Sequence, residues 1–249
     1  MKITILTLFP SLFDGFLTSS ILARAIARSL VSVELVDIRD FAAGRHRVCD
    51  DAAYGGGPGM VMKPEPVAAA LEASGCVGRR VVYLTPAGRP YRQAVAAELA
   101  QEPELALLCG RYEGVDQRVI DAFVTDEISI GDYVLSGGEV AAMVLVDSIA
   151  RLVPGVITGD SLEEESFASG LLEYPHYTRP EMFRGVGVPD VLLSGHHEKI
   201  RQWRLMKSIE KTMKLRPELL KTDSLPVEAQ ELLGKMTSEG VEDERNQGD

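Results

Sequence analysis

The chain has little cysteine, no long apolar run and no excess of basic residues, and each of these shortages excludes a class of protein. Its three cysteines, Cys49, Cys76 and Cys109, lie far apart among 249 residues, so we expect neither a disulfide framework nor a CxxC redox or metal pair. Apolar runs such as VVYL and LALLC are far shorter than a helix that spans a bilayer. MKITILTLF is followed directly by Pro10. We therefore expect a folded cytoplasmic protein with neither a signal peptide nor a membrane segment.

The net charge of −11 conceals one basic segment. Residues 1–170 and 222–249 carry net charges of −9 and −6, whereas residues 171–221 hold ten basic and six acidic residues, a net charge of +4. Eight of those ten basic residues lie within 199–221. Because the neutralisation of phosphates supplies much of the free energy of nucleic-acid binding, the segment 199–221 is a candidate contact for a polyanion.

Apolar and β-branched residues form four strand-like runs, which alternate with segments of helical composition. The runs cover residues 3–8, 31–36, 81–84 and 105–108, and the helical segments include 21–30 and 67–72. This alternation predicts an α/β fold with a parallel sheet. Gly137 and Gly138 precede the run EVAAMVLVDSIARLV, whose apolar residues cover most of a helical circumference. We expect that helix to be buried on nearly all sides, with cover from a second subunit.

The composition changes after Pro154 and indicates a second domain. TGDSLEEES, at residues 158–166, is polar, acidic and free of aromatic residues, which is typical of an exposed linker. We place the first domain at 1–158, the linker at 159–172 and a helical domain at 173–249. The closing stretch VEDERNQGD is predicted to be a disordered acidic tail.

One long helix is expected in the second domain. Ser194 is a candidate N-cap for a helix that extends through Lys214. Its apolar stripe is formed by Trp203, Met206, Ile209 and Met213, and its basic face by Arg204, Lys207, Lys211 and Lys214. A basic helix face is more often simply solvated than used for binding.

Four glycine-rich stretches stand near the ends of predicted strands. They are YGGGPGM (54–60), LTPAGRP (84–90), CGRYEG (109–114) and IGDYVLSGGE (130–139). The last three follow or interrupt strands, so we expect them to converge at the carboxyl edge of one sheet, where open α/β folds bind ligands. The sequence contains no GxGxxG after a strand, no GK[ST] ending of a P-loop, no HExxH and no GxSxG. Dinucleotide, triphosphate, zinc and serine-hydrolase chemistry therefore have no motif to support them.

The segments YGGGPGM, YLTPAGR, CGRYEGVDQR, SIGDYVLSGGE, ARLVPGV and GLLEYPHYTRP, in this order, resemble the bacterial tRNA (guanine-N1)-methyltransferase family. The resemblance runs from the first strand to RPELL at 216–220. It implies that a methyl group is transferred from S-adenosyl-L-methionine to N1 of the guanosine directly 3′ of the tRNA anticodon. It also implies a SPOUT fold with a deep trefoil knot, a small, mostly helical tRNA-binding domain, and a homodimer with an active site shared between subunits.

The resemblance also implies which residues bind the donor and the RNA. The donor-binding residues, called the donor set below, are Tyr83, Leu84, Pro86, Gly110, Tyr112, Glu113, Gly114, Ile130, Gly131, Asp132, Tyr133, Val134, Leu135, Gly137 and Gly138. The residues expected to contact RNA are Tyr54, Gly55, Gly56, Gly57, Arg204, Lys207, Lys211 and Lys214. Backbone groups can bind the edge of a neutral adenine while apolar side chains such as Leu84, Ile130 and Leu135 cover its faces.

Methylation at guanine N1 needs a base, because the N1 proton is only weakly acidic at neutral pH. The resemblance implies that Arg151 is the electrostatic partner and that a linker carboxylate, acting across the dimer interface, is the base. The family generally has Asp before a Ser-Phe pair, whereas this chain has Glu165. We assign the base to Glu165 and keep Asp160 and Glu164 as alternatives. Without the resemblance, Arg151 would be read as an ion-pair partner of Asp147.

Two further expectations concern metal binding and an alternative function. Carboxylates around 160–165 are candidates to hold Mg²⁺ through water, although the sequence shows no dedicated ligand set. The alternative function is a non-catalytic RNA-binding or ribosome-assembly α/β protein, in which the glycine-rich stretches are turns and the basic helix binds phosphate. Such a protein would bind RNA in a salt-sensitive way without binding the methyl donor.

Overall fold

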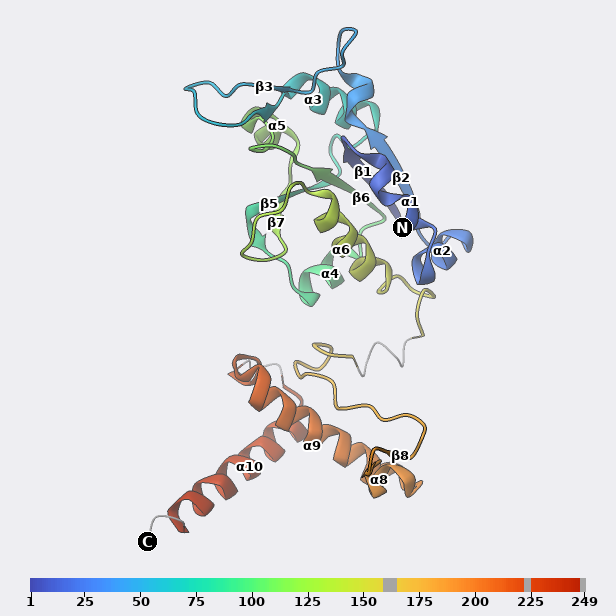
Figure 1. Ribbon diagram of the computed structural model, residues 1–249, viewed down its shortest axis with the longest axis vertical. Helices are drawn as coiled ribbons and strands as arrows, with labels where there is room; N and C mark the ends of the chain where they lie inside the picture. The colour runs from blue at the N-terminus through green and yellow to red at the C-terminus, as the bar shows by residue number, and fades with distance from the viewer. Residues whose placement is uncertain (159–164, 222–224, 247–249) are drawn as a thin grey trace. The chain divides into compact units, whose positions relative to one another are not determined.

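A computed structural model of the chain (Figure 1) describes residues 1–158, 165–221 and 225–246. The chain divides into two compact units, Met1–Thr158 and Gly159–Asp249. Each unit has a hydrophobic core of its own. Within the described ranges, no helix combines the length and apolarity that a membrane crossing requires.

The first unit is built on a five-stranded sheet whose strand order is β2-β1-β6-β5-β7. All four pairs of neighbours are parallel, which confirms the predicted parallel sheet. The strands are β1 (Lys2–Thr7), β2 (Ser32–Asp37), β5 (Arg80–Pro90), β6 (Glu104–Cys109) and β7 (Asp126–Ser129). The first four strands begin within about two residues of the predicted runs, and three of them also end there. β5 extends six residues beyond the predicted end. The sequence did not predict β7.

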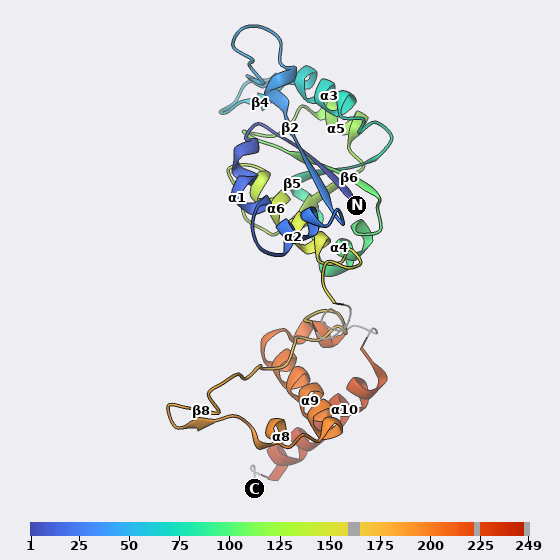
Figure 2. The same cartoon turned by 90° about the vertical axis from the view of Figure 1, so that its right-hand side faces the viewer.

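Helices cover both faces of this sheet, as Figure 2 shows. One face packs on the 3-10 helix η1 (Pro10–Phe13) and on α2 (Ser20–Ala27), α4 (Gln93–Leu99) and α6 (Glu139–Ala150), beside the short α1 (Asp14–Leu17). The other face packs on η2 (Ile38–Phe41), α3 (Pro64–Ala73) and α5 (Gln117–Phe123). Because the sheet is buried on both faces, its central strands are almost continuously apolar, as in LALLC of β6.

Helix α6 has one exposed apolar face in the single chain. Ala142, Leu145 and Val146 are completely buried, but Val140 is 55% exposed and Val144 43% exposed. These two valines are four residues apart and lie on one face of the helix. The exposed apolar face is the part of α6 for which the sequence predicts cover from a second subunit.

The second unit consists of helices and one small hairpin. The helices are α8 (Asp190–Leu193), α9 (His197–Leu215), η3 (Pro217–Lys221) and α10 (Val227–Asn246), and the hairpin pairs β8 (Met182–Phe183) with β9 (Val186–Gly187). Its core contains Leu171, Ile209, Leu225 and Ala229. Leu171 falls inside the predicted linker 159–172, so the end of that segment packs with the second unit.

Three local predictions for the second unit need correction. Ser194 does not cap the long helix: it is the C-cap of α8, and His196 caps α9 by accepting a hydrogen bond from the amide of Lys199 at Nδ1 (3.3 Å). In the predicted apolar stripe, Ile209 reaches the core but Met213 is exposed. The predicted disorder from residue 241 is wrong up to Asn246, where α10 ends, and 247–249 lie outside the described residues.

Candidate functional site

A cavity opens beside residues 85–86 of β5 and the end of β7. It is lined by Thr85, Pro86, Ile128, Ser129, Ile130, Gly131, Tyr133, Leu135, Gly137 and Ala141. Six of these ten residues belong to the donor set: Pro86, Ile130, Gly131, Tyr133, Leu135 and Gly137. The lining combines apolar side chains with glycine backbone, which suits a flat neutral ring.

Strand β5 contributes to the cavity by leaving the sheet and returning to it. Leu84 and Arg89 both pair with Ile128 of β7, so the four residues between them bulge out of the ladder. The returning arm is then fixed by the amide of Tyr91, which donates to the carbonyl of Ser129 at 2.7 Å. A Cβ atom at Gly88 would overlap the backbone of Glu127 and Ile128. The glycine of LTPAGRP is therefore required for the close approach of β5 to β7.

The segments after β6 and before α6 are joined to each other by backbone contacts. The amide of Gly138 donates to the carbonyl of Gly110 at 2.8 Å, and Arg111 forms an isolated antiparallel bridge with Gly137. A Cβ atom at Gly138 would lie 2.8 Å from Cα of Cys109, so only glycine allows this approach. The structure thus brings together CGRYEG and IGDYVLSGGE, as the sequence predicts.

A buried ion pair that sequence reasoning missed holds this junction. Glu139, 1% exposed, accepts hydrogen bonds at Oε1 from Nε of Arg111 (3.1 Å) and Oγ1 of Thr7 (2.8 Å). The guanidinium of Arg111 also donates to the carbonyl of Ser136 at 3.1 Å and lies 4.4 Å from the ring centre of Phe9. The only sequence signal for this pair is a carboxylate at the start of a helix that is otherwise almost entirely apolar.

Tyr83 and Leu84, at the end of the first arm of β5, point to opposite faces of the sheet. Leu84 belongs to the core beneath α6, whereas Tyr83 belongs to the core beneath α3 and α5. Burial raises the pKa of Tyr83, and the backbone of Val115 acts in the opposite direction. Cβ atoms at Gly110 and Gly114 would lie 2.8 and 3.2 Å from atoms of the Tyr83 side chain. These two glycines leave room for the tyrosine that supports their loop.

The remaining members of the donor set lie on more exposed backbone. Tyr112 has a φ of +58° and is 49% exposed, and its pKa is raised by partial burial and by the neighbouring Asp50. The amide of Glu113 donates to the carbonyl of Met60 at 2.9 Å, which ties the loop to the end of YGGGPGM. Asp132 is exposed and Val134 is 88% exposed.

Comparison with known proteins decides the family. The family model described as tRNA (Guanine-1)-methyltransferase TrmD matches residues 1–222. The chain belongs to this family.

Relatives with the name tRNA (guanine-N(1)-)-methyltransferase match nearly the whole chain. The protein of Treponema denticola is 54% identical over 220 residues, which cover 88% of this chain and 90% of that protein. The protein of Pelotomaculum thermopropionicum is 56% identical over 242 residues, or 95% and 96% of the two chains. The protein of Geotalea uraniireducens is 56% identical over 239 residues, or 95% and 97%. Membership of the TrmD family confirms the resemblance that the sequence motifs indicate.

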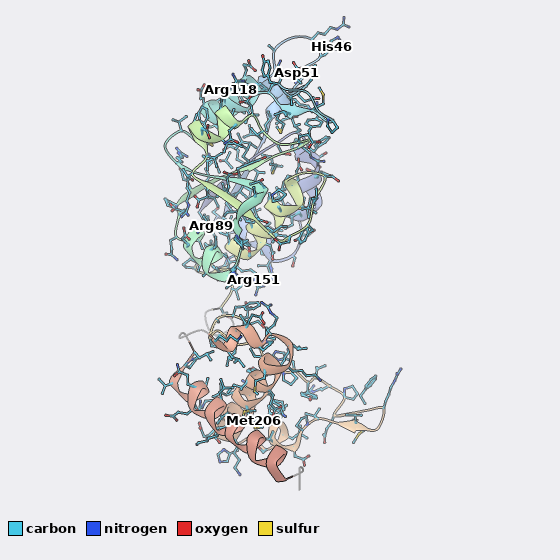
Figure 3. All side chains as sticks on the ribbon, turned by 90° about the vertical axis from the view of Figure 1, so that its left-hand side faces the viewer. His46, Asp51, Arg89, Arg118, Arg151 and Met206 are labelled. Atoms are coloured by element: carbon cyan, nitrogen blue, oxygen red, sulfur yellow. The ribbon has the colours of Figure 1, made fainter. Side chains whose placement is uncertain are left out.

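Of the two predicted catalytic residues of this TrmD family member, Arg151 does not line the cavity of its own chain. Arg151 follows the last residue of α6, whereas Ala141, in the first turn of that helix, and Gly137, two residues before it, line the cavity. A helix of 12 residues is about 18 Å long, so Arg151 stands far from the cavity of its own chain. Figure 3 labels Arg151 at one end of the first unit and Asp51 at the other. Glu165 belongs to the second unit, and Asp160 and Glu164 lie outside the described residues.

The residues expected to contact RNA lie in two places. Tyr54 is fully exposed, and Gly55, Gly56 and Gly57 all have positive φ. On α9, Nζ of Lys207 lies 2.6 Å from Glu210 and Nζ of Lys211 donates to the carbonyl of Glu173 at 2.9 Å. The guanidinium of Arg204 lies 4.8 Å from the ring centre of Tyr174. Lys214 is exposed.

The predicted Mg²⁺ contact falls mostly on residues 159–164, which lie outside the described residues. Among the residues that the structure does describe, no three His, Cys, Asp or Glu side chains are grouped so that they could hold a metal ion.

Proposed function

We propose that this chain transfers a methyl group from S-adenosyl-L-methionine to N1 of the guanosine directly 3′ of the anticodon in tRNA. Membership of the TrmD family supports guanine-N1 methylation of tRNA. The observation that carries the proposal is the cavity beside residues 85–86 of β5 and the end of β7, because six members of the donor set line it. A tRNA substrate also agrees with the cytoplasmic location that the sequence predicts.

The residues that line the donor cavity suit the chemistry of S-adenosyl-L-methionine. Pro86, Ile130 and Leu135 supply apolar surface for the faces of the adenine. Gly131 and Gly137 present backbone groups that side chains do not block. When bound, the donor supplies a methyl group on a sulfonium, which is open to in-line attack. We propose that the segments 84–90, 109–114 and 130–139, which the sheet order brings together, form the trefoil knot of a SPOUT fold.

The protein must remove a proton from guanine N1 and stabilise the charge that this leaves on the base. We propose that the carboxylate of Glu165 accepts this proton. The guanidinium of Arg151 then stabilises the negative charge at O6. The basic residues of α9, of which Lys214 is exposed, and the exposed Tyr54 would hold the RNA. Arg and Lys contacts to phosphate are electrostatic and do not depend on base sequence.

A homodimer would bring Arg151 to a donor cavity. Arg151 lies about one helix length, roughly 18 Å, from the cavity of its own chain. If two copies of α6 pack against each other in opposite directions through the exposed face at Val140 and Val144, the Arg151 end of one helix lies near the cavity end of the other. We therefore propose that the cavity of one subunit works with Arg151 of its partner, in a site that also takes Glu165 from the linker.

Calorimetry with S-adenosyl-L-methionine tests the donor site, and methyl transfer to a tRNA with G directly 3′ of the anticodon tests the reaction. The alternative, a non-catalytic RNA-binding protein, predicts no heat on addition of the donor. Arg151→Ala and Glu165→Ala should each lower turnover by about 100-fold or more while donor binding persists. Glu164→Ala is the matched control for Glu165. Full turnover of Glu165→Ala would remove that residue from the mechanism.

A further inference from the structure

The two arginines at opposite ends of β5 bind the same carboxylate. Arg80 donates to Asp126 through Nε and Nη2, at 2.9 Å each, and Arg89 donates to Oδ1 of Asp126 through Nη2, also at 2.9 Å. Asp126 is the first residue of β7. Arg80 and Arg89 are nine residues apart in an extended strand, so their side chains can meet on one carboxylate only because the strand bulges between them.

The same two arginines are also joined through α4. Both bind Glu98: Arg89 donates to it with two nitrogens, at 3.2 and 3.3 Å, and Arg80 forms a short contact with it. Arg80 further binds Glu102 at 3.2 Å. The side chain of Asp126 is 12% exposed and that of Arg80 19% exposed, whereas Arg89 is 41% exposed. We call Arg80, Arg89, Asp126, Glu98 and Glu102 the β5 clamp.

The β5 clamp holds the two ends of the segment that forms one wall of the donor cavity. Thr85 and Pro86 line the cavity, and they lie between the two arginines of the clamp. Ile128 and Ser129 also line the cavity, and they belong to β7, the strand that carries Asp126. The clamp therefore ties the outgoing and returning arms of β5 to a neighbouring strand that also lines the cavity.

We infer that Arg89 is a positioning residue for the methyl donor: its bonds to Asp126 and Glu98 hold the segment 85–88 in the conformation that the donor binds. This inference rests on the proposed function of the cavity. A wall that is already ordered before binding saves the entropy of ordering it on binding. The role falls to Arg89 rather than to Arg80, because Arg80 is the more buried member and also holds together the start of β5, β7 and α4.

Arg89 can be removed without removing a large part of the protein's stability. Its side chain is exposed to about two fifths, and an exposed ion pair contributes little to the free energy of unfolding. Arg79 is a matched control: its side chain is 42% exposed, it pairs with Glu104, and it stands one residue before β5 rather than in the clamp. Arg79→Ala therefore removes a comparable ion pair at a position away from the cavity wall.

The test compares wild type, Arg89→Ala, Arg89→Lys and Arg79→Ala by calorimetry with S-adenosyl-L-methionine, by steady-state kinetics with both substrates, and by thermal unfolding. For Arg89→Ala we expect the dissociation constant and the KM for the donor to rise by about fivefold to tenfold. The KM for tRNA should stay within twofold of wild type, on the order of experimental error. Arg89→Lys, which keeps the charge but not the fork of donors, should recover part of the loss. Arg79→Ala should bind the donor like wild type.

The outcomes separate this inference from the proposed function. If wild type itself gives no heat with the donor, the proposed function fails. If wild type binds and Arg89→Ala binds equally well, the positioning role of Arg89 is wrong. A purely structural role is indicated if Arg89→Ala lowers the unfolding temperature and weakens donor and tRNA binding in parallel, or if Arg79→Ala has the same effect on donor binding. Either of these results also overturns the inference.

Discussion

Arg111 and Glu139 form an ion pair that joins the loop after β6 to the first turn of α6. Nε of Arg111 lies 2.9 Å from Oε2 of Glu139, and the Glu139 side chain is 1% exposed. The same carboxylate accepts a hydrogen bond from Thr7, at the end of β1. One buried charge thereby connects the ends of two central strands to the helix whose first turn lines the cavity.

Glu139→Gln should destabilise the protein, because the substitution leaves the partly buried Arg111 without its counter-charge. We expect a loss of about 3 kcal/mol in the free energy of unfolding, measured with urea, since breaking a buried pair typically costs this much. Thr7→Val removes one hydrogen bond to the same carboxylate and should cost about 1 kcal/mol. Equal stability of Glu139→Gln and wild type would show that the pair does not hold the loop in place.

Gly88→Ala should disturb the cavity through the backbone. The added Cβ would overlap Glu127 and Ile128, so β5 and β7 must move apart, at a cost of about 1–3 kcal/mol in unfolding free energy. Donor binding should weaken as well, because Ile128 lines the cavity. Gly15→Ala is the control, because a Cβ at Gly15 meets nothing within 4 Å and alanine favours the helix that contains it. If Gly88→Ala were as stable as wild type, this result would contradict the close approach of β5 to β7.

The sheet could be predicted from the sequence because its central strands are nearly continuous apolar runs. β7 escaped prediction because its sequence, DEIS, has only four residues and two charges. It becomes a strand by pairing with β5, a partner that lies more than 30 residues earlier in the chain. Tertiary pairing of this kind outweighs local propensity. The N-cap of α9 was misplaced for a related reason, since both Ser194 and His196 can accept a hydrogen bond and only the path of the chain decides between them.

The location of the candidate site at one edge of the sheet was predictable from the sequence, but the ion pairs that hold its loops in place were not. Loops that follow neighbouring parallel strands must meet at one edge of the sheet, and the cavity lies there. The Arg111–Glu139 pair and the Arg89–Asp126 contact span 28 and 37 residues, and no sequence motif links their members. The distance between Arg151 and the cavity follows from the length of α6, once the cavity is known to lie at the first turn of that helix.

Acid should weaken the fold through the β5 clamp. Hydrogen bonds from Arg80 hold the pKa of Asp126 below its ordinary value of 3.8, and hydrogen bonds from Arg80 and Arg89 hold the pKa of Glu98 below 4.5. Because both pKa values are lowered by folding, the stabilisation is fully present above the ordinary values and is lost as the pH falls through the folded-state values.

Urea unfolding at several pH values checks this dependence. The free energy of unfolding should decline below about pH 4. Asp126→Asn should lower stability at neutral pH and make the decline less steep, because one of the titrating groups is gone. An unchanged slope in Asp126→Asn would place the acid sensitivity in other carboxylates.

The three thiols should be inert in the folded protein. Cys49, Cys76 and Cys109 are all buried, and burial raises the pKa of each. Because the thiolate is the reactive form, we expect no rapid reaction with a thiol reagent near neutral pH, and reaction of all three in urea. Rapid labelling of any one thiol in the folded state would contradict its burial.

Mixtures of inactive variants should reveal which subunit supplies Arg151. Leu135→Arg blocks the donor cavity at a residue that is 38% exposed, and Arg151→Ala removes the guanidinium. If the cavity of one subunit works with the partner's arginine, a mixed dimer of these two variants has one site with both an intact cavity and an intact arginine. After subunit exchange, half of the dimers are mixed and each has one working site of two, so activity should recover to about one quarter of wild type. No recovery despite proven exchange would place Arg151 at the cavity of its own chain.

A mixture of Arg151→Ala and Glu165→Ala shows whether these two residues come from the same subunit. This mixture recovers activity only if the two residues reach a given site from different subunits.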